Sequence, residues 1–526
     1  PEAEAPPSPR PKTFSERVLT DSQSFVSDAV RGPDRDAVPG GRPRPLLEIG
    51  DPFLGQTPIQ EGIELPTGAV WNPSLLVYGT FRTAVQVFDN GLDRAPVPGA
   101  RRIKPRSEWA NRLDLFANLQ LSGTERIVLG FRPLDDVRQR RRGYTGYEFE
   151  PNRVQGQPGE VDDWNDGVNA RITTLFFEGD FGEIFPNLDP DDSSLLDIGF
   201  SVGRQNLLFQ DGVMINGTMD AVGITRNSLR FLPYSSNTRI TLLYGDPDLI
   251  QPRSPNRANP PSATNLEFLQ SLKTGRPRKR TDRQLDLVAL LTATDFYFTT
   301  MELDFAYTNL RNNGASGLFF GAAFHQRIGH FNTTFRWNGS VALGEERIDG
   351  PQDGHLLNVE ISLDVPRTHP LIPDIIYFNA FLGIDRYRSA YRDPDNPSPL
   401  GRVGITYAGR GIGRYGSILG DQVTNDVNSA AAGSGRRNPL RFGDRAVGFA
   451  LGYQMFLFGD VRKQLIVEVA GRRSTVPHRH LGAYAVGVRY QQAFLDHFIL
   501  LVEGFQGKTE GMVEAYGARC EFIVKF

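Results

Sequence analysis

The stretch that decides the fold is Gly511-Met512-Val513-Glu514-Ala515-Tyr516-Gly517-Ala518-Arg519-Cys520-Glu521-Phe522-Ile523-Val524-Lys525-Phe526. At a period of two residues, one face carries Tyr516, Ala518, Cys520, Phe522, Val524 and Phe526, and the other carries Arg519, Glu521 and Lys525. In a transmembrane β-barrel one face of each strand meets lipid, the other meets an aqueous lumen, and aromatic residues lie at the membrane–water boundary. The stretch therefore predicts a membrane-spanning strand whose even-numbered residues face lipid.

Composition agrees with a barrel rather than with membrane helices. Apolar residues make up 39 % of the 526 residues, and the mean hydropathy is −0.35. No segment approaches the roughly 18–20 uninterrupted apolar residues that a transmembrane helix needs, whereas barrel strands hide their hydrophobicity in alternation. A formal charge of −3 argues against a nucleic-acid partner. The single cysteine, Cys520, excludes an intramolecular disulfide framework.

Residues 1–72 differ in composition from the rest of the chain. They are rich in Pro, Arg, Asp and Glu and lack sustained periodicity, apart from a short helical pattern over residues 15–30. We therefore expect a mostly irregular, Pro-rich N-terminal extension that lies in the lumen or in the periplasm. Residues 73–526 are expected to form the barrel. Because the sequence begins at Pro1 without an apolar signal core, we expect an exported protein whose signal peptide has been removed.

Long alternating segments occupy the chain from residue 74 onward. The alternation is clearest over residues 113–121, 332–343, 355–366 and 373–386. Tight turns separate some segments, whereas long polar connections span residues 134–169, 246–283 and 393–443. Short turns at one end and long loops at the other are typical of an all-β, antiparallel up-and-down transmembrane barrel. We count about eighteen strands, an even number as in single-chain bacterial barrels.

Charged residues at the inward positions of these strands predict a polar lumen. Near the two ends of the barrel domain the candidate pore-lining residues are Arg112, Arg126, Arg132, Arg489 and Arg519. In the middle strands they are Glu302, Asp304, Glu360, Asp364 and Asp385, together with Arg336. Because the first and last strands become neighbours when a barrel closes, the basic set is expected to form one wall and the acidic set the opposite wall. The alternative is that these charges pair with one another.

One segment carries a family resemblance. Residues 202–214 contain Gly203-Arg204-Gln205, followed by the pair Asp211-Gly212, and the chain returns through an Arg-Thr-like step at Thr225-Arg226. This segment resembles the signature of alginate-export-type outer-membrane porins. The resemblance implies an eighteen-stranded barrel and, for the family's namesake, export of an anionic polyuronate through an arginine-lined lumen. The chain departs from the family in lacking its Trp and Asp after the loop and in carrying residues 1–72.

The end of the chain also resembles the C-terminal signal by which bacterial outer-membrane barrels are recognised for assembly. The residues that carry this resemblance are Phe522, Val524 and Phe526. It implies that the barrel-assembly machinery is a partner. We expect this last strand to pair with the first barrel strand over residues 75–87, because no sheet edge can remain in lipid. Arg204 and Gln205 are expected to bond inside the barrel or at a strand end, away from the hydrocarbon.

Other motifs indicate neither an enzyme nor a cofactor. The G-x-G-x-x-G pattern of residues 411–416 has no strand before it and no helix after it, as a dinucleotide site requires. His478 and His480 have no further ligands nearby for zinc. The acidic turns of residues 189–192 and 393–396 lack the spacing of a calcium loop. The basic run of residues 276–280 is expected in an outer loop that touches lipopolysaccharide.

These patterns predict a porin of the bacterial outer membrane that lets small hydrophilic or charged solutes diffuse through a water-filled pore. Two alternatives are an export channel for an acidic, alginate-like polysaccharide and a structural barrel that anchors a cell-surface or periplasmic assembly. In the second alternative, a periplasmic or surface protein would bind residues 1–72. Outer-membrane lipid and lipopolysaccharide are expected partners in every case.

Overall fold

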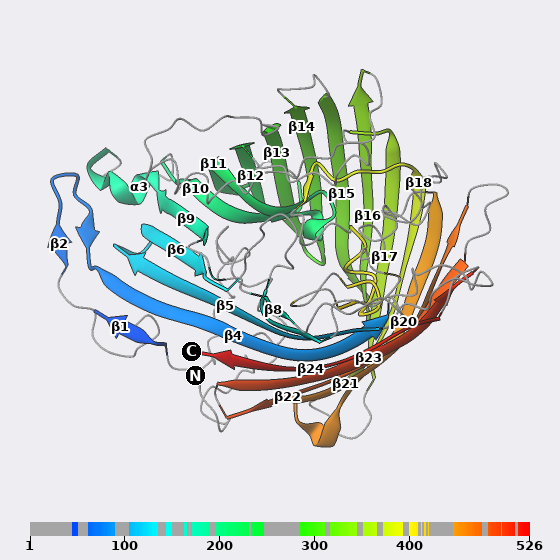
Figure 1. Cartoon of the computed structure of the whole chain (residues 1–526). Helices are drawn as coiled ribbons and strands as arrows, with labels where there is room; N and C mark the ends of the chain where they lie inside the picture. The colour runs from blue at the N-terminus through cyan, green and yellow to red at the C-terminus, as the bar shows by residue number, and fades with distance from the viewer. Residues whose placement is uncertain are drawn as a thin grey trace, which may run out of the picture.

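The computed structural model describes 45–50, 62–89, 105–134, 144–149, 163–165, 168, 171–188, 196–230, 233–246, 285–310, 316–344, 351–365, 372–392, 399–408, 412, 415–416, 419, 445–475, 482–495, 497–510 and 514–526. It is a closed antiparallel β-barrel with eighteen strand positions (Figure 1). Two positions are each shared by two strands, because β6 and β7 lie end to end along β5, and β9 and β8 follow along them. The all-β barrel and its strand number are thus confirmed.

The strands that form the barrel are listed here in order around it. They are β4 (Ser74–Asp89), β5 (Arg106–Gln120), β6 (Arg126–Arg132) with β7 (Thr145–Phe149), β9 (Arg171–Asp180) with β8 (Asp163–Asn165), β10 (Ile198–Phe209), β11 (Ile215–Leu229), β12 (Ser235–Asp246), β13 (Leu285–Phe296), β14 (Thr299–Leu310), β15 (Ser316–Ile328), β16 (Phe331–Leu343), β17 (Gly354–Val365), β18 (Asp374–Asp385), β20 (Ala446–Phe456), β21 (Lys463–Ser474), β22 (Gly482–Phe494), β23 (Phe498–Thr509) and β24 (Glu514–Lys525). The short elements are β1 (Leu47–Ile49), β2 (Ile63–Glu64), β3 (Val70–Trp71), α3 (Phe181–Ile184), η1 (Pro186–Leu188), η2 (Gln210–Gly212), β19 (Tyr391–Arg392) and η4 (Leu457–Gly459).

The barrel closes through its last strand. Strand β24 pairs with β4 in a register that runs from Tyr516↔Asp89 to Lys525↔Thr80. Beyond it, Gly79 N–H donates to the Phe526 carbonyl at 2.7 Å. The predicted pairing of the first and last strands is confirmed. The paired residues of β4 are 80–89, whereas residues 75–87 were predicted. Closure between β24 and β4 leaves no unpaired edge at this seam.

The outer surface of the barrel is an apolar belt. Large hydrophobic side chains alternate along most strands and remain exposed, including Val85, Val87, Phe305, Tyr307, Phe335, Trp337, Val469, Val486 and Tyr516. On β24 the inward residues Arg519 and Glu521 are buried, while Cys520 on the outward face is exposed. The parity expected from the sequence therefore holds on this strand. Among the described residues, no helix is long and apolar enough to cross a membrane.

Short turns and long connections lie at opposite ends of the barrel. We call the end with the β5–β6, β15–β16 and η4 turns and with Phe526 the short-turn end; in barrels of this type it faces the periplasm. We call the opposite end the long-loop end. Strand β1 pairs with β4 at the short-turn end, through Leu47↔Val77. Most of residues 1–72 lie outside the described residues, so the place of the extension stays a prediction.

Two of the expected connections contain structure. Residues 134–169 were expected to form a polar loop, but β7 and β8 continue the barrel wall within them. Residues 393–443 were expected to form an outer loop. Instead, the described part of that connection folds into the lumen, where it is drawn in yellow in Figure 1.

Candidate functional site

The β10–β11 hairpin leaves the barrel wall and enters the lumen (Figure 1). Strand β10 pairs with β9 only as far as Arg204↔Leu175, whereas β10 and β11 stay paired to Phe209↔Ile215. We call residues 205–219 the inserted hairpin. Its bend falls at Gly203, whose φ is 130° and where an added Cβ would lie 2.3 Å from the Leu175 carbonyl oxygen. A residue with a side chain fits this position poorly.

The family-motif residues therefore build the bend and the tip of this hairpin. Arg204 lies where the wall pairing ends and forms an ion pair with Asp220 at 2.7 Å. Arg204 thus lies inside β10 and not at a strand end as predicted, although its ion pair agrees with the prediction that it bonds to another polar group. Gln205 is buried and accepts a hydrogen bond from the Ser201 hydroxyl at 3.0 Å. Asp211 and Gly212 form the tip in η2.

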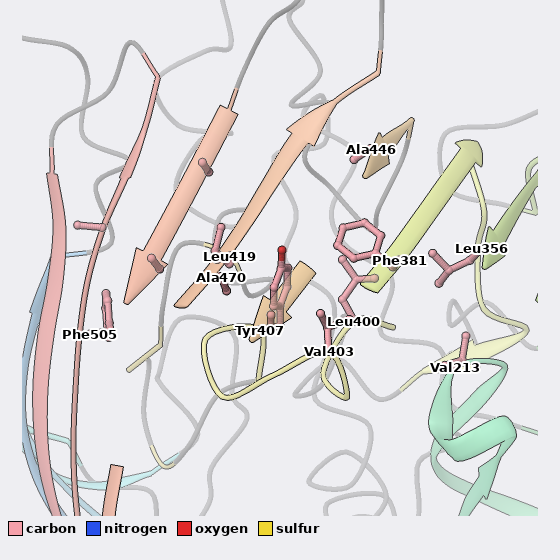
Figure 2. Packing of buried hydrophobic residues seen from close by; sticks show 14 of the residues in the cluster. Val213, Leu356, Phe381, Leu400, Val403, Tyr407, Leu419, Ala446, Ala470 and Phe505 are labelled. Atoms are coloured by element: carbon pink, nitrogen blue, oxygen red, sulfur yellow. The ribbon is translucent and has the colours of Figure 1, made fainter. Parts of the chain in front are cut away.

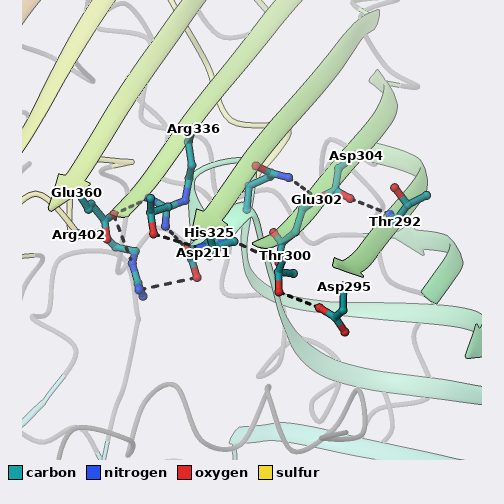
Figure 3. Close-up of polar contacts among 12 residues, drawn as sticks. Asp211, Thr292, Asp295, Thr300, Glu302, Asp304, His325, Arg336, Glu360 and Arg402 are labelled. Atoms are coloured by element: carbon teal, nitrogen blue, oxygen red, sulfur yellow. Dashed lines mark hydrogen bonds and ion pairs between the residues drawn. The ribbon is translucent and has the colours of Figure 1, made fainter. Parts of the chain in front are cut away.

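Polar contacts hold the tip of the inserted hairpin against β14, β16 and β17 (Figure 3). The Arg336 guanidinium is 1 % exposed and forms ion pairs with Asp211 and, at 2.5 Å, with Glu360. Arg402 lies 3.8 Å from both of these carboxylates. Two arginines and two carboxylates therefore form one compensated cluster, because each carboxylate has both cations within ion-pair range.

A second contact fixes the hairpin beside this cluster. The Gln210 side-chain amide donates to Asp304 at 2.8 Å, and the other Asp304 oxygen accepts from the Thr292 backbone at 3.0 Å. Asp304 was predicted to line the pore, but its side chain is buried under the hairpin tip. On the same strand, Glu302 lies 3.9 Å from His325.

A second inserted segment fills another part of the lumen. We call described residues 386–392, 399–408, 412, 415–416 and 419 the luminal segment. Its apolar side chains pack on inward-facing residues of β17, β18 and β20–β24 (Figure 2). The cluster comprises Tyr387, Leu400, Val403, Tyr407, Tyr415 and Leu419 of the segment, Val213 of the hairpin, and Phe88, Leu356, Phe381, Ala446, Ala450, Ala470, Ala483, Ala485, Phe505 and Ala515 of the wall. Full burial of one large apolar side chain is worth about 1.5–3 kcal/mol.

Glu468 anchors the luminal segment. Its carboxylate is fully buried and accepts from the backbone amides of Ile405 at 2.8 Å and Thr406 at 2.9 Å. It also accepts from the Thr406 hydroxyl at 2.6 Å and from the Tyr377 hydroxyl at 2.5 Å. A Cβ at Gly404 would lie 2.3 Å from this carboxylate, so a side chain at this position would have to displace it.

The two inserted segments meet inside the barrel. Strand β19 of the luminal segment pairs in parallel with β11 through Tyr391↔Ile215. The Val213 carbonyl accepts from the Tyr387 hydroxyl at 3.1 Å and from the Ser389 hydroxyl at 2.6 Å. Together the segments form a partition, in contact with the wall from β13 through β24 to β4.

The basic positions predicted from the sequence face inward, but they do not form an uncompensated wall. Arg112 and Arg132 both pair with Asp114, at 2.9 Å and 2.5 Å. Arg126 pairs with Glu178, and Arg489 pairs with Glu503 at 2.7 Å. Arg519 pairs with Glu521 and approaches Glu503 to 3.5 Å. The alternative of mutual pairing therefore describes these residues better than a basic wall.

The acidic positions are scattered rather than gathered on one wall. Glu360 and Arg336 belong to the compensated cluster. Asp364 is exposed near the short-turn end of β17. Asp385 lies at the other end of β18, where it pairs with Arg445 at 2.7 Å with both side chains about half exposed. Sequence parity placed the acids correctly on strands but did not show their depth along the barrel.

A cavity of about 420 Å³ lies on the short-turn side of the compensated cluster. Its lining comes from β15, β16, β17 and β18, with Phe298 from the β13–β14 turn. The lining residues are Phe298, His325, Gln326, Arg327, Asn332, Thr333, Thr334, Glu360, Ile361, Ser362, Tyr377 and Asn379. Of these residues, Glu360 is a predicted pore-lining residue.

Several of the weaker motifs lie outside the described residues. They are residues 276–280, 393–396 and 478–480, and most of residues 189–192 and 411–416. Within the described part of the chain, no group of three or more His, Cys, Asp or Glu side chains is placed to hold a metal ion.

Comparison with known proteins gives no family assignment. No family model matches the chain, and no curated protein matches it. Similar solved structures include the outer membrane protein OpdK from Pseudomonas aeruginosa, with 10 % identity, a TM-score of 0.47, and coverage of 86 % of this chain and 98 % of that chain. OccAB2 from Acinetobacter baumannii has 10 % identity, a TM-score of 0.47 and the same coverage. A BenF-like porin from Pseudomonas fluorescens Pf-5 has 9 % identity, a TM-score of 0.47 and the same coverage.

The alginate-export-type resemblance is not confirmed by these comparisons. The compartment follows from the barrel itself. A closed antiparallel barrel of even strand number, with an apolar outer belt and a polar interior, is the architecture of bacterial outer-membrane proteins. The chain is therefore an outer-membrane barrel.

Proposed function

We propose that this chain is a porin that forms a constricted, water-filled path for small hydrophilic or charged solutes. The observation that carries the proposal is the lumen, where ion pairs such as Arg489–Glu503 lie beside a partition made of the two inserted segments. Charged side chains facing an aqueous lumen are typical of barrels with a channel. The partition narrows the lumen, which favours small solutes over polymers.

Export of an acidic polysaccharide is less well supported. A polyanion needs cations that are free to bind it, but Arg112, Arg126, Arg489 and Arg519 each have a carboxylate partner. An exported chain would have to displace these pairs and also pass the partition. Anchoring of a periplasmic or surface assembly depends on residues 1–72, most of which lie outside the described residues, so that alternative stays a prediction.

The same proposal includes its membrane partners. The apolar belt would contact outer-membrane lipid, and the long-loop end would meet lipopolysaccharide. Phe522, Val524 and Phe526 share the outward parity of β24, which is compatible with recognition of this strand by the barrel-assembly machinery. A channel of this kind needs no cofactor and no catalytic residues.

Single-channel recording tests the proposal. The full-length chain is purified in detergent, inserted into planar bilayers and recorded in symmetric salt and in a salt gradient. We expect discrete conductance steps with weak ion selectivity, because paired charges compensate and salt screens within about 8–10 Å. Strong anion selectivity that is lost when Arg112 and Arg132 are replaced by alanine would favour polymer export. Folded protein that gives no conductance would contradict the channel and favour an anchor.

A further inference from the structure

The cavity beside the compensated cluster has the features of a binding site. Its volume of about 420 Å³ lies within the roughly 300–1,000 Å³ of small-molecule sites. It lies on the wall between the constriction and the short-turn end, so it is open to a solute that has passed the partition. Four neighbouring strands of the wall line it, and such a lining is rigid.

The inward-facing side chains of this cavity are mostly neutral hydrogen-bonding groups. Strand parity directs Asn332, Thr334, Ser362, Tyr377 and Asn379 toward the lumen. The Tyr377 hydroxyl already donates to Glu468 and the Asn379 amide already donates to the Arg402 and Val403 carbonyls, so these two side chains offer a ligand their oxygens as acceptors. The His325 ring shares a hydrogen bond with the Thr334 hydroxyl at 3.1 Å. Hydroxyl and amide groups both donate and accept hydrogen bonds. They therefore match a ligand that carries several hydroxyl groups.

Most of the charges near the cavity already pair with one another. Glu360 is committed to Arg336, and Arg402 lies within 3.8 Å of Glu360 and Asp211. Arg327 lies at the short-turn rim and donates to the Gly329 carbonyl at 3.3 Å. Next to the compensated cluster, a charged group of a solute would have to compete with these ion pairs for its counter-charge, whereas a neutral group would not. The cavity therefore favours a ligand without net charge.

An aromatic ring stands at the mouth of the cavity. Phe298 is 80 % exposed although it lies in the turn between two barrel strands. A flat apolar ring beside a set of hydrogen-bonding groups fits a sugar, because a pyranose has apolar C–H faces and a polar rim. The ring would contact one face while the hydroxyl and amide groups bond the rim.

We propose that this cavity binds an uncharged polyhydroxylated solute of the size of a mono- or disaccharide. The inference rests on the porin function proposed above and names the solute class of that channel. Binding on the short-turn side of the partition would hold the sugar next to the constriction after it has crossed the partition.

Current block in planar bilayers tests this inference. Glucose is added to the full-length channel and compared with glucuronate and glucosamine, which have the same ring with a carboxylate or an amine. We expect glucose to reduce the ion current in a saturable way and with a lower half-blocking concentration than either charged analogue. Because glucuronate carries the carboxylate found on each unit of a polyuronate, its effect on the current also tests the export alternative.

Variants of the cavity give the second arm of the test. Asn332→Ala combined with Ser362→Ala removes two hydrogen-bonding side chains, and each lost bond should raise the half-blocking concentration of glucose about three- to tenfold. Phe298→Ala should raise it by a similar factor. The matched control is Thr80→Val, which removes a hydroxyl from the inward face of β4, outside the cavity. It should leave the block by glucose unchanged.

The outcomes separate this inference from the proposed function. Conductance with glucose block that weakens in the cavity variants but not in Thr80→Val supports both. Conductance without glucose block, stronger block by glucuronate or glucosamine, or block that the cavity variants leave unchanged overturns the sugar site and leaves the porin intact. Folded protein without any conductance overturns the proposed function itself.

Discussion

Replacing Glu468 should release the luminal segment and open the pore. The side chain accepts four hydrogen bonds, three of them from Ile405 and Thr406 of the segment. Glu468→Ala leaves those donors without their acceptor in a buried site. The cost of an unsatisfied buried donor is about 1–3 kcal/mol, so three such donors set an upper limit of roughly 9 kcal/mol. Removing the desolvated carboxylate recovers several kcal/mol, which leaves a net loss of about 3–5 kcal/mol.

A loss of this size changes the population of the detached segment strongly. Each 1.4 kcal/mol is a factor of about ten in an equilibrium constant, so we expect detached states to become roughly 10²–10⁴ times more populated. The packing of Tyr407 and its neighbours opposes full release. Single-channel records should therefore show brief, larger openings that are rare or missing in the parent channel.

Two further variants sharpen this experiment. Gly404→Ala keeps the carboxylate but places a Cβ 2.3 Å from it, so it should give the same large openings. Asp385→Asn is the control, because its ion pair with Arg445 is about half exposed and such pairs contribute about 0–1 kcal/mol. Heat-modifiable migration in detergent gels verifies that each barrel is folded. If folded Glu468→Ala channels open as the parent does, Glu468 does not hold the segment.

Three other perturbations follow from the structure. Gly203→Val should prevent the inward bend of the hairpin and raise the conductance, whereas Gly199→Ala on the same strand has space for its Cβ and should not, as bilayer recording can check. Arg336→Met removes the cation between two carboxylates, so the reversal potential in a salt gradient should shift toward cation selectivity; an unchanged potential would contradict the compensated cluster. Burial and, to a smaller extent, the nearby Glu183 raise the pKa of Glu125 in the β5–β6 turn. A folded-state pKa above the unfolded value means that stability falls as pH rises above about 4.5. Glu125→Gln should then unfold at a higher temperature than the parent at pH 7 but not near pH 4, whereas an equal difference at both pH values would refute this account.

Sequence parity predicts the wall of this barrel well, because each strand has one face in lipid. On β24 the outward residues Cys520, Phe522 and Val524 and the inward Arg519 and Glu521 follow directly from alternation. The hydrocarbon accepts few polar side chains, so the outward face is constrained at every second residue. Strand number and closure follow from the same constraint.

The inserted hairpin was not predictable in the same way. Both faces of residues 205–219 meet other parts of the protein or water, so neither face has to be apolar at every second residue as in a wall strand. The bend lies beside Gly203, whose φ of 130° a residue with a side chain rarely adopts. Glycine is also common inside strands, so no residue type marks this bend. The motif pointed to the right segment, but not to its path.

The sequence of the wall strands does indicate that a luminal segment packs on them. Inward positions of a water-filled barrel are expected to be polar, yet Ala446, Ala470, Ala483, Ala485 and Ala515 occupy such positions. Small apolar residues facing a lumen gain nothing from water, whereas they allow a segment to pack closely against the wall. An inward run of alanines therefore predicts that something covers it.

The inward-facing alanines and the inward-facing arginines lie at different levels along the barrel axis. On β22 and β24 the alanines lie toward the long-loop end, while Arg489 and Arg519 lie nearer the short-turn end. Polarity therefore changes along the barrel axis, whereas the sequence analysis expected opposite walls of opposite sign. Ion pairs at one level present both signs to every passing solute. Because a transverse field needs separated charges, we expect size and hydrogen bonding, more than the sign of charge, to select what crosses the partition.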